Sequence, residues 1–406
     1  MKRFASSVAA FTLVLGLAAG AAHSAPNQSF DAFIRDFEAK AVAAGISRDV
    51  YRQATQGLTA DPSIPTFQAT QPEFETPIWD YIEGRVSERR VSDGRAAVAR
   101  NKPLFDRIGR EFGVDPYILA AIWGMESDYG AILSNRTYIK PVIRSLASLV
   151  HQRRGRLAAD EAEFIAALRI IQQGDARADT LVGSWAGAIG HLQLIPTAFL
   201  RYATDEDGDG RRDPHGSLAD ALASSAKYLR DLGYQTGHDW GYEVELPSGF
   251  DYSLAGREHY RPASFFAQRG VKRVAGREFS DLNENVFLYV PAGRNGPKFL
   301  MTANYLVLKG YNFSDSYALA VAHLTDRLKG AGPFVDDWPR NAHFLNRAQR
   351  VDLQERLKRA GYYDGEVDGR LGPITARALS AWQAANGQVA DGFATLEAYQ
   401  ALRSGN

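Results

Sequence analysis

The sequence predicts a mainly α-helical protein with a small β-rich insertion and a C-terminal module of three helices. Apolar residues recur every three or four positions through most of the chain, which is the spacing of helices that bury one face. Residues 243–298 differ, with short alternating or aromatic runs among many Gly and Pro. Hydrophobic residues make up 45% of the 406 residues and aromatic residues 11%, as in globular chains of two or three domains.

Charge and cysteine content exclude several classes of protein. Lys plus Arg equals Asp plus Glu at 47 each, which gives no sign of nucleic-acid binding or of a polybasic membrane surface. The chain has no cysteine, so it has no disulfide, no thiolate nucleophile and no Cys-ligated zinc. We expect neither a nucleic-acid partner nor an organic cofactor.

Residues 1–25 have the pattern of a secretory signal peptide. Lys2 and Arg3 precede an apolar run from about Val8 to Ala22, and Ser24 and Ala25 are small residues near a cleavage point. The run is short for a membrane span, which needs about 20 residues. We therefore expect removal of this segment and a soluble periplasmic protein without stable membrane insertion.

The first part of the mature chain is predicted to be helical, with one interruption. Helical spacing covers residues 28–60, with a break at Gly45, and resumes from Trp79 to about Phe112, where Asp93-Gly94 suggests a turn. Between these regions, residues 61–78 hold four prolines and are predicted to form an extended wrapping segment.

The stretch from Val114 to Gly130 predicts a helix with an unusual carboxylate. Asp115 can cap its start, Pro116 suits the first helical position, and Gly130 is a plausible stop. Glu126 falls inside the apolar stripe, whereas Asp128 would fall on the opposite side. A carboxylate at a core position is either a general acid with a raised pKa or a group paired with a buried Arg, and this stretch alone favours neither.

A second block, Gly183 to Phe199, begins with small residues around Trp185 and carries Ser184, His191 and Gln193 as polar groups. So little side-chain bulk lets backbone or ligand approach closely. The alternative is a tight packing site between a helix and a loop. The block does not end in Gly-Lys-Ser/Thr, which argues against a nucleotide-binding loop.

The acidic run that begins at Asp205 resembles the first half of an EF-hand calcium loop. Asp205, Asp207 and Asp209 stand at positions 1, 3 and 5, Gly210 at position 6 and the Arg211 carbonyl at position 7. Position 12 is Gly216 instead of the usual Glu, so Asp220 would complete the site only in a longer loop. An exposed acidic turn is the alternative, and we favour Ca²⁺.

The remaining segments complete the predicted architecture. Further helices are expected over residues 141–150, 158–173, 218–232 and 298–329. The last of these carries Tyr311, Asn312 and Tyr317, which suit either a sugar-binding surface or a core of satisfied aromatics. Residues 330–343 predict a mobile linker, and residues 345–402 three short helices.

Three ordered blocks carry a specific resemblance. They are Ile122–Gly130, Gly183–Pro196 and Tyr311–Val321. Together they resemble the lytic murein transglycosylases of the B type over residues 28–330, and the acidic run lies where that family carries its calcium site. The pattern Gly361-Tyr362-Tyr363-Asp364-Gly365 and its surroundings resemble the small peptidoglycan-binding domain of cell-wall enzymes.

The resemblance implies a lysozyme-like α+β catalytic domain over residues 26–331, with the β-rich insertion at about 243–298. A linker over 332–343 and a peptidoglycan-binding domain over 344–406 would follow. The implied reaction cleaves the β-1,4 bond between N-acetylmuramic acid and N-acetylglucosamine without water and forms 1,6-anhydromuramic ends. Glu126 matches the family's single catalytic acid/base.

The resemblance also assigns binding residues and partners. Ser184 and Gln193 match positions that contact the sugar, and Tyr311, Asn312 and Tyr317 match the block that faces Glu126. The implied ligands of a structural Ca²⁺ are Asp205, Asp207, Asp209, the Arg211 carbonyl and Asp220. Peptidoglycan glycan strands are the expected substrate, cell-wall synthesis or division proteins are candidate partners, and we expect a monomer.

Two alternatives compete with a lytic transglycosylase. In a hydrolytic muramidase, water would replace the muramic C6 hydroxyl. Asp128 is the other acid close to Glu126 on that stretch, and its predicted far-side position argues against it as a second catalytic carboxylate. In a non-catalytic scaffold protein, peptidoglycan binding by the C-terminal module would be the sole activity. Glu126 argues against the scaffold, because an inactive relative has no reason to keep a buried acid.

Overall fold

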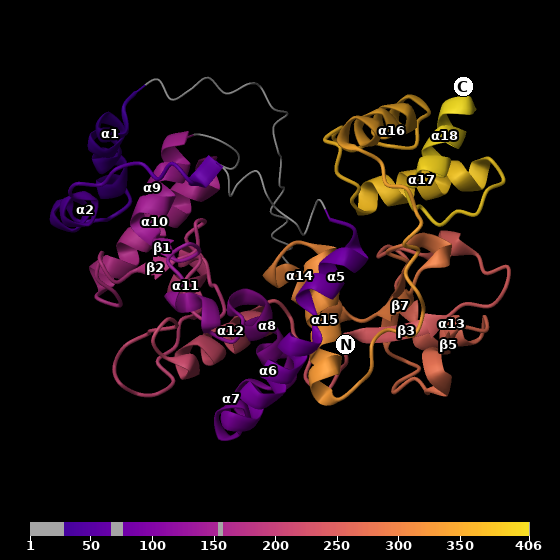
Figure 1. Cartoon of the computed structure of the whole chain (residues 1–406), viewed down its shortest axis with the longest axis horizontal. Coiled ribbons are helices and arrows are strands. Elements are labelled where there is room, and N and C mark those ends of the chain that lie inside the picture. The colour runs from indigo at the N-terminus through magenta and orange to yellow at the C-terminus, as the bar shows by residue number, and fades with distance from the viewer. Residues whose placement is uncertain (1–27, 66–75, 153–156, 406) are drawn as a thin grey trace, which may run out of the picture.

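The computed structural model describes residues 28–65, 76–152 and 157–405, and these form a mostly helical molecule with one small sheet (Figure 1). The predicted signal peptide and most of the predicted wrapping segment lie outside the described residues. Among those that are described, no helix combines the length and the apolar character needed to cross a bilayer.

The N-terminal lobe is a group of helices packed against one another. Its helices are α1 (Phe30–Ala43), α2 (Arg48–Thr55), α9 (Val142–Gln152), α10 (Leu157–Gln173) and α11 (Pro196–Tyr202). Ser29 and Ser47 cap α1 and α2, and the chain turns between them at Gly45, as predicted. A short antiparallel pair, β1 (Lys140–Pro141) and β2 (Val182–Gly183), lies beside α9.

Three helices follow where the sequence predicts one long helical region. They are α5 (Ile78–Arg85), α6 (Glu88–Arg100) and α7 (Lys102–Phe112). The predicted turn at Asp93-Gly94 is wrong, because both residues lie inside α6. A Cβ built on Gly94 would lie 2.1 Å from the Tyr129 hydroxyl oxygen, so this glycine makes room for a neighbouring ring without breaking the helix.

The centre of the molecule is a helical core around α8 (Pro116–Ser127), against which α15 (Asp315–Lys329) packs. α12 (Leu218–Asp231) and α14 (Ala303–Tyr311) complete it. The predicted helix start at Lys298 is wrong, because Lys298–Met301 is strand β7, and Thr302 caps α14 directly after it. Phe299 and Met301 are fully buried in the sheet, a use of apolar residues that helical periodicity does not distinguish.

The β-rich insertion is confirmed, and it extends slightly beyond its predicted limits. Its strands are β3 (Gly241–Glu245), β4 (Arg261–Pro262), β5 (Lys272–Arg273), β6 (Asn285–Tyr289) and β7. They form an antiparallel sheet in the order β4-β6-β7-β3-β5, and the short helix α13 (Ala263–Ala267) adds Phe266 to the small core behind it.

The C-terminal module contains the three predicted helices, α16 (Arg347–Arg359), α17 (Pro373–Ala385) and α18 (Leu396–Ser404). They enclose a core of their own, which includes Leu353, Leu379 and Trp382. Gln354 is fully buried, and its amide bonds to the loop between α16 and α17, for example to the Gly369 N–H at 2.7 Å. The described part of the module therefore has its own core and its own buried polar centre.

Residues 331–343, here named the strap, connect the catalytic part to this module without regular secondary structure. The strap packs against the rest of the molecule. Phe334 stacks on His323 of α15 with ring centroids 3.9 Å apart, and Trp338 packs against Trp79. The peptide N–H groups of Val335 and Asp336 donate to the Glu243 carboxylate at 2.9 Å.

Replacing Glu243 with Ala should release the strap. Two backbone N–H groups would lose their acceptor at a cost of about 1–3 kcal/mol, which corresponds to roughly 5- to 150-fold more of the open state. Limited proteolysis should therefore cut residues 331–343 faster by about that factor. Glu245→Ala, which removes an exposed carboxylate from the same strand, is the control and should leave the rate unchanged. Equal cutting of both variants would contradict the anchoring role of Glu243.

Candidate active site

The helix α8 is buried from Ile118 to Ser127, with Glu126 as the exception. Ile118 to Met125 and Ser127 are all buried, whereas Glu126 is partly exposed. Asp115 caps the helix through its carboxylate, and Pro116 occupies the first turn, as predicted. The scaffold thus fixes the backbone of Glu126 firmly, and the residue remains partly exposed.

Tyr317 of α15 donates a hydrogen bond from its hydroxyl to Oε1 of Glu126 at 2.5 Å. Tyr317 is 3% exposed, and burial first and the charge of Glu126 second raise its pKa well above the ordinary value. The phenol therefore keeps its proton and remains a donor. A hydrogen bond of this kind holds the carboxyl in one orientation.

The block from Gly183 to Leu194 folds into a compact loop. Backbone bridges join Gly183 to Ile189 and Ile189 to Leu194. A Cβ on Gly183 would lie 2.1 Å from the Ala188 carbonyl oxygen, which explains the small residues here. Ser184 accepts the Ala188 N–H through Oγ at 3.1 Å, and Gln193 has a positive φ of 52° and donates from Nε2 to the Gly190 carbonyl at 2.8 Å.

Two hydrogen bonds attach this loop to the other two blocks. The Tyr311 hydroxyl donates to the Leu192 carbonyl at 2.7 Å, and it lies 3.0 Å from Oγ of Ser225 on α12. On the other side, Nε1–H of Trp123 on α8 donates to Nδ1 of His191 at 3.0 Å. Since Tyr317 already joins α15 to Glu126, the three sequence blocks are bonded to one another in pairs.

His191 can accept from Trp123 only while Nδ1 carries no proton. Burial first, and the nearby His215 second, lower the pKa of His191 to about 4. The ring is therefore neutral near pH 7 and acts as an acceptor that fixes the loop to α8. Sequence reasoning gave His191 no role, because its partner lies 68 residues away and nothing local marks the contact.

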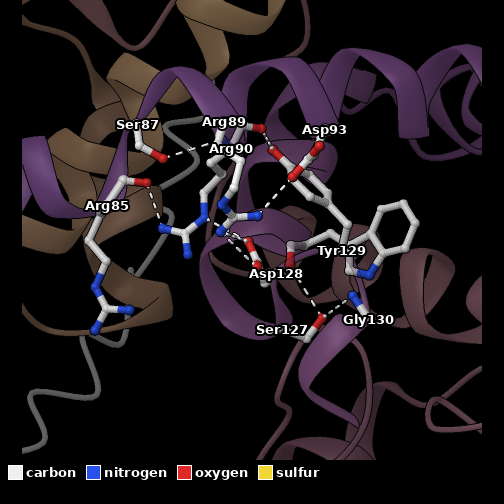
Figure 2. Close-up of polar contacts among 10 residues, drawn as sticks. Arg85, Ser87, Arg89, Arg90, Asp93, Ser127, Asp128, Tyr129 and Gly130 are labelled. Carbon is white, nitrogen blue, oxygen red and sulfur yellow. Dashed lines mark hydrogen bonds and ion pairs between the residues drawn. The ribbon is translucent and has the colours of Figure 1, made fainter. Parts of the chain in front are cut away.

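Asp128 forms ion pairs with two arginines of α6 (Figure 2). Its carboxylate accepts from Arg89 at 2.9 Å and from Arg90 at 3.1 Å. Burial alone would raise the pKa of Asp128, but the hydrogen bonds and charges of both arginines hold it below its usual range. α8 ends at Ser127, before the predicted stop at Gly130, so Asp128 is no longer part of the helix.

The acidic loop brings together three of its predicted ligands. Carboxylate oxygens of Asp205, Asp207 and Asp209 lie within 4.8 Å of one another, close enough for one cation with oxygen ligands at 2.3–2.6 Å. Asp220 is not part of this group. It is 1% exposed, and its two oxygens accept the N–H groups of Glu206 and Asp213, each at 2.8 Å. Asp220 thus holds the loop closed, and the donor set of the other three fits Ca²⁺.

Among the predicted sugar-contacting residues, the structure separates two groups. The hydroxyls of Tyr311 and Tyr317 bond to protein atoms and hold the site together. Ser184, Gln193 and Asn312 are partly exposed polar residues on the loop and at the end of α14. The latter three are therefore the better candidates for direct contact with a ligand.

Comparison with known proteins gives matches over both parts of the chain. Residues 29–326 match the family model described as a transglycosylase SLT domain, and residues 346–402 match the putative peptidoglycan binding domain. The membrane-bound lytic murein transglycosylase B of Escherichia coli (strain K12) is 26% identical over 272 residues, which cover 65% of this chain and 71% of that protein.

Solved structures agree with these matches. The chain is similar to SltB3 from Pseudomonas aeruginosa in complex with NAG-anhNAM-pentapeptide, with 42% identity, a TM-score of 0.86, and coverage of 93% of this chain and 100% of that chain. The Escherichia coli lytic transglycosylase Slt35 in complex with calcium is 21% identical, with a TM-score of 0.59 and coverage of 77% and 96%. The second likeness concerns the fold alone.

The neutral state of His191 should make the protein less stable in mild acid. Its folded pKa of about 4 lies below the unfolded value of 6.5, so the unfolded chain binds the proton first as pH falls. The contribution of His191 is complete above pH 6.5 and is lost between 6.5 and 4, by about 1–3 kcal/mol. In His191→Gln, the amide oxygen can still accept from Trp123 but does not titrate.

Melting temperatures of the two proteins should be compared across this pH range. The decline toward low pH should be shallower in His191→Gln than in the parent protein. His343→Gln, which changes an exposed histidine, should melt like the parent at every pH. Parallel curves for His191→Gln and the parent would show that the His191 ring is protonated in the folded state.

Proposed function

Since the chain belongs to the transglycosylase SLT domain family and is a peptidoglycan lytic transglycosylase, we propose that Glu126 is its single catalytic acid/base. The observation that carries this proposal is the position of Glu126. It is the partly exposed carboxyl of an otherwise buried helix, and a buried tyrosine hydroxyl orients it.

The reaction needs one carboxyl group in two protonation states. Protonated Glu126 gives its proton to the glycosidic oxygen as the bond from muramic C1 to that oxygen breaks. The Glu126 carboxylate then takes the proton of the muramic C6 hydroxyl while the C6 oxygen bonds to C1 and closes the 1,6-anhydro ring. No water is consumed, and Glu126 ends in the protonation state in which it began.

The nucleophile belongs to the substrate, which accounts for a single acid at the site. A two-carboxylate glycosidase needs its second acid as nucleophile or as base for water. Here the C6 hydroxyl is already tethered to the reacting ring, and an intramolecular attack has a large entropic advantage. Tyr317 fits both half-reactions, because its hydroxyl donates to Oε1 whether the other oxygen of Glu126 holds a proton or not.

The hydrolytic alternative would need a second group to activate water. Asp128 is the nearest acid in sequence, but Arg89 and Arg90 hold its carboxylate as an ion pair outside the helix. Ser184, Gln193 and Asn312 would supply the polar groups that bind the sugar. Ser184 accepts a backbone N–H, so its own hydroxyl proton can be donated to the substrate.

We further propose that Asp205, Asp207 and Asp209 hold a structural Ca²⁺, with the Arg211 carbonyl as a fourth protein ligand. The ion would neutralise three carboxylates in one turn and fix the loop. Arg107 of α7 bonds to Glu206 in this loop at 2.5 Å, so the ion would also stabilise the contact between the loop and the helical core. Asp220 acts through the backbone in this arrangement.

The remaining assignments concern place and organisation. The N-terminal residues 1–25 match a signal peptide, which supports export to the periplasm, where peptidoglycan lies. Residues 26–331 would form the catalytic domain, 332–343 the linker and 344–406 the peptidoglycan-binding domain. We propose that the enzyme works as a monomer and that cell-wall synthesis or division proteins recruit it.

Glu126→Gln should abolish the release of anhydro-muropeptides. The amide keeps the shape of the side chain but cannot donate a proton to the glycosidic oxygen, so the rate should fall by at least about 10²–10⁴-fold. Purified sacculi are incubated with each protein, and released products are weighed by mass spectrometry. Anhydro products lack one water relative to products with reducing ends.

Two comparisons make this test decisive. Glu111→Gln, on the exposed face of α7, should release products at the parent rate. Glu126→Gln should still bind sacculi through the C-terminal module. If Glu126→Gln cuts normally, the assignment of the acid/base is wrong, and reducing ends from the parent protein would indicate hydrolysis.

Calcium should raise the melting temperature of the protein. An ion that binds the native state alone stabilises it by about 3–4 kcal/mol at 100 to 1,000 times its Kd. Thermal melts with added Ca²⁺ and with a chelator measure the shift. The double variant Asp207→Asn/Asp209→Asn should lose it, and Asp364→Asn, an exposed acid of the C-terminal module, should keep it. No shift in the parent would identify the loop as an acidic turn without an ion.

A further inference from the structure

The chain leaves α8 through three consecutive left-handed residues. They are Asp128 with φ of 50°, Tyr129 with 57° and Gly130 with 88°. Gly adopts this conformation freely and Asp tolerates it, but for Tyr it is strained by about 1–3 kcal/mol. Such strain persists only where surrounding contacts impose it, and here it lies three residues after Glu126.

The first of these contacts is ionic (Figure 2). Arg89 and Arg90 both donate to the Asp128 carboxylate, and the side chain of Arg90 is only 11% exposed. Arg90 also donates from Nη1 to the Arg85 carbonyl at 2.6 Å, which ties it to the end of α5. A partly buried pair with several hydrogen bonds resists displacement far better than an exposed one.

The second contact is a ring in a notch made by two glycines. A Cβ on Gly94 of α6 or on Gly124 of α8 would lie within 2.6 Å of atoms of the Tyr129 ring. The Tyr129 hydroxyl donates to the Arg90 carbonyl at 3.0 Å, and Trp123 meets the ring edge-on with centroids 5.5 Å apart. The left-handed backbone is what turns this ring back between the two helices.

We propose that Asp128 and Tyr129 form a clamp that fixes the end of α8 on α6 and thereby sets the position of the Glu126 carboxyl. Asp128 is a positioning residue in this proposal, and it takes no part in proton transfer. The inference rests on the proposed function, because it assigns the clamp a purpose only if Glu126 performs the chemistry.

The position of the clamp explains why it would affect catalysis. Glu126 lies in the last turn of α8, where the helix could fray or rotate. The Oε1 atom of Glu126 must meet the hydroxyl of Tyr317, which comes from a different helix, α15. A shift of about 1 Å at the end of α8 would misalign this pair, and misplacement of that size can reduce a rate by about 10²-fold.

Three variants separate positioning from stability and from chemistry. Asp128→Gly keeps the left-handed backbone at no steric cost but removes the partner of both arginines. Asp128→Asn tolerates the same backbone and keeps one acceptor oxygen. Asp93→Asn is the matched control, because Asp93 is an exposed acid of α6 that also pairs with Arg89. For each variant, kcat and KM for anhydro-muropeptide release and the melting temperature are measured.

The proposal predicts a split between kcat and KM. In Asp128→Gly, kcat should fall by about 10- to 100-fold, while KM stays within about twofold and the protein remains folded at the assay temperature. Asp128→Asn should recover a substantial part of that loss, and Asp93→Asn should match the parent in both constants. This order of kcat values is expected if Asp128 acts by positioning Glu126.

Other outcomes overturn the inference. Parent-like kcat in Asp128→Gly would show that the clamp does not position Glu126. Asp128→Asn as inactive as Glu126→Gln would show that the charge of Asp128 takes part in the reaction. A loss that disappears at lower assay temperature, in step with the folded fraction, would show a purely structural role. If the parent and Asp93→Asn both release no anhydro products, the proposed function fails instead.

Discussion

The hydrogen bond between Tyr317 and Glu126 is the constraint on which the rest of the site depends. It joins residues 191 positions apart, so it exists only when α15 lies correctly against α8. Two further bonds, Trp123 to His191 and Tyr311 to Leu192, attach the small-residue loop to α8 and to the end of α14. Each of these polar groups is buried or partly buried, and an unpaired one would cost about 1–3 kcal/mol. The Glu126 carboxyl is therefore correctly oriented only when α15 and the small-residue loop are correctly packed against α8.

Much of the fold could be predicted from the sequence, because helices that bury one face record this burial at regular spacing. Most of the helices, the β-rich insertion and the C-terminal module are confirmed. The errors share a physical cause, which is tertiary contact that local pattern does not contain. Gly94 serves the Tyr129 ring, and Lys298–Met301 is recruited into a sheet by strands β3 and β6. Periodicity cannot distinguish these uses.

The candidate site shows the same division. That Glu126 stands out among apolar neighbours is visible in the sequence. The hydrogen-bond partners of the side chains are not visible in the sequence, and knowing them changes several interpretations. The hydroxyls of Tyr311 and Tyr317 bond within the protein, Asp220 closes the acidic loop through backbone N–H groups, and His191 accepts from Trp123. The residue types show which chemical groups the site contains. Hydrogen bonds to distant segments determine which of these groups remain free to contact a substrate.

The strap and the C-terminal module both pack against the catalytic part of the chain. Glu243 and His323 hold the strap on the catalytic side, and the module itself meets the insertion where the Arg294 N–H donates to Asp391 at 3.1 Å. A flexible tether raises the local concentration of substrate for any strand within its reach, whereas a rigid connection favours a strand that fits both parts simultaneously. The enzyme would thus prefer glycan strands that reach both the active site and the C-terminal module. Lengthening the strap would change which strand geometry meets this condition.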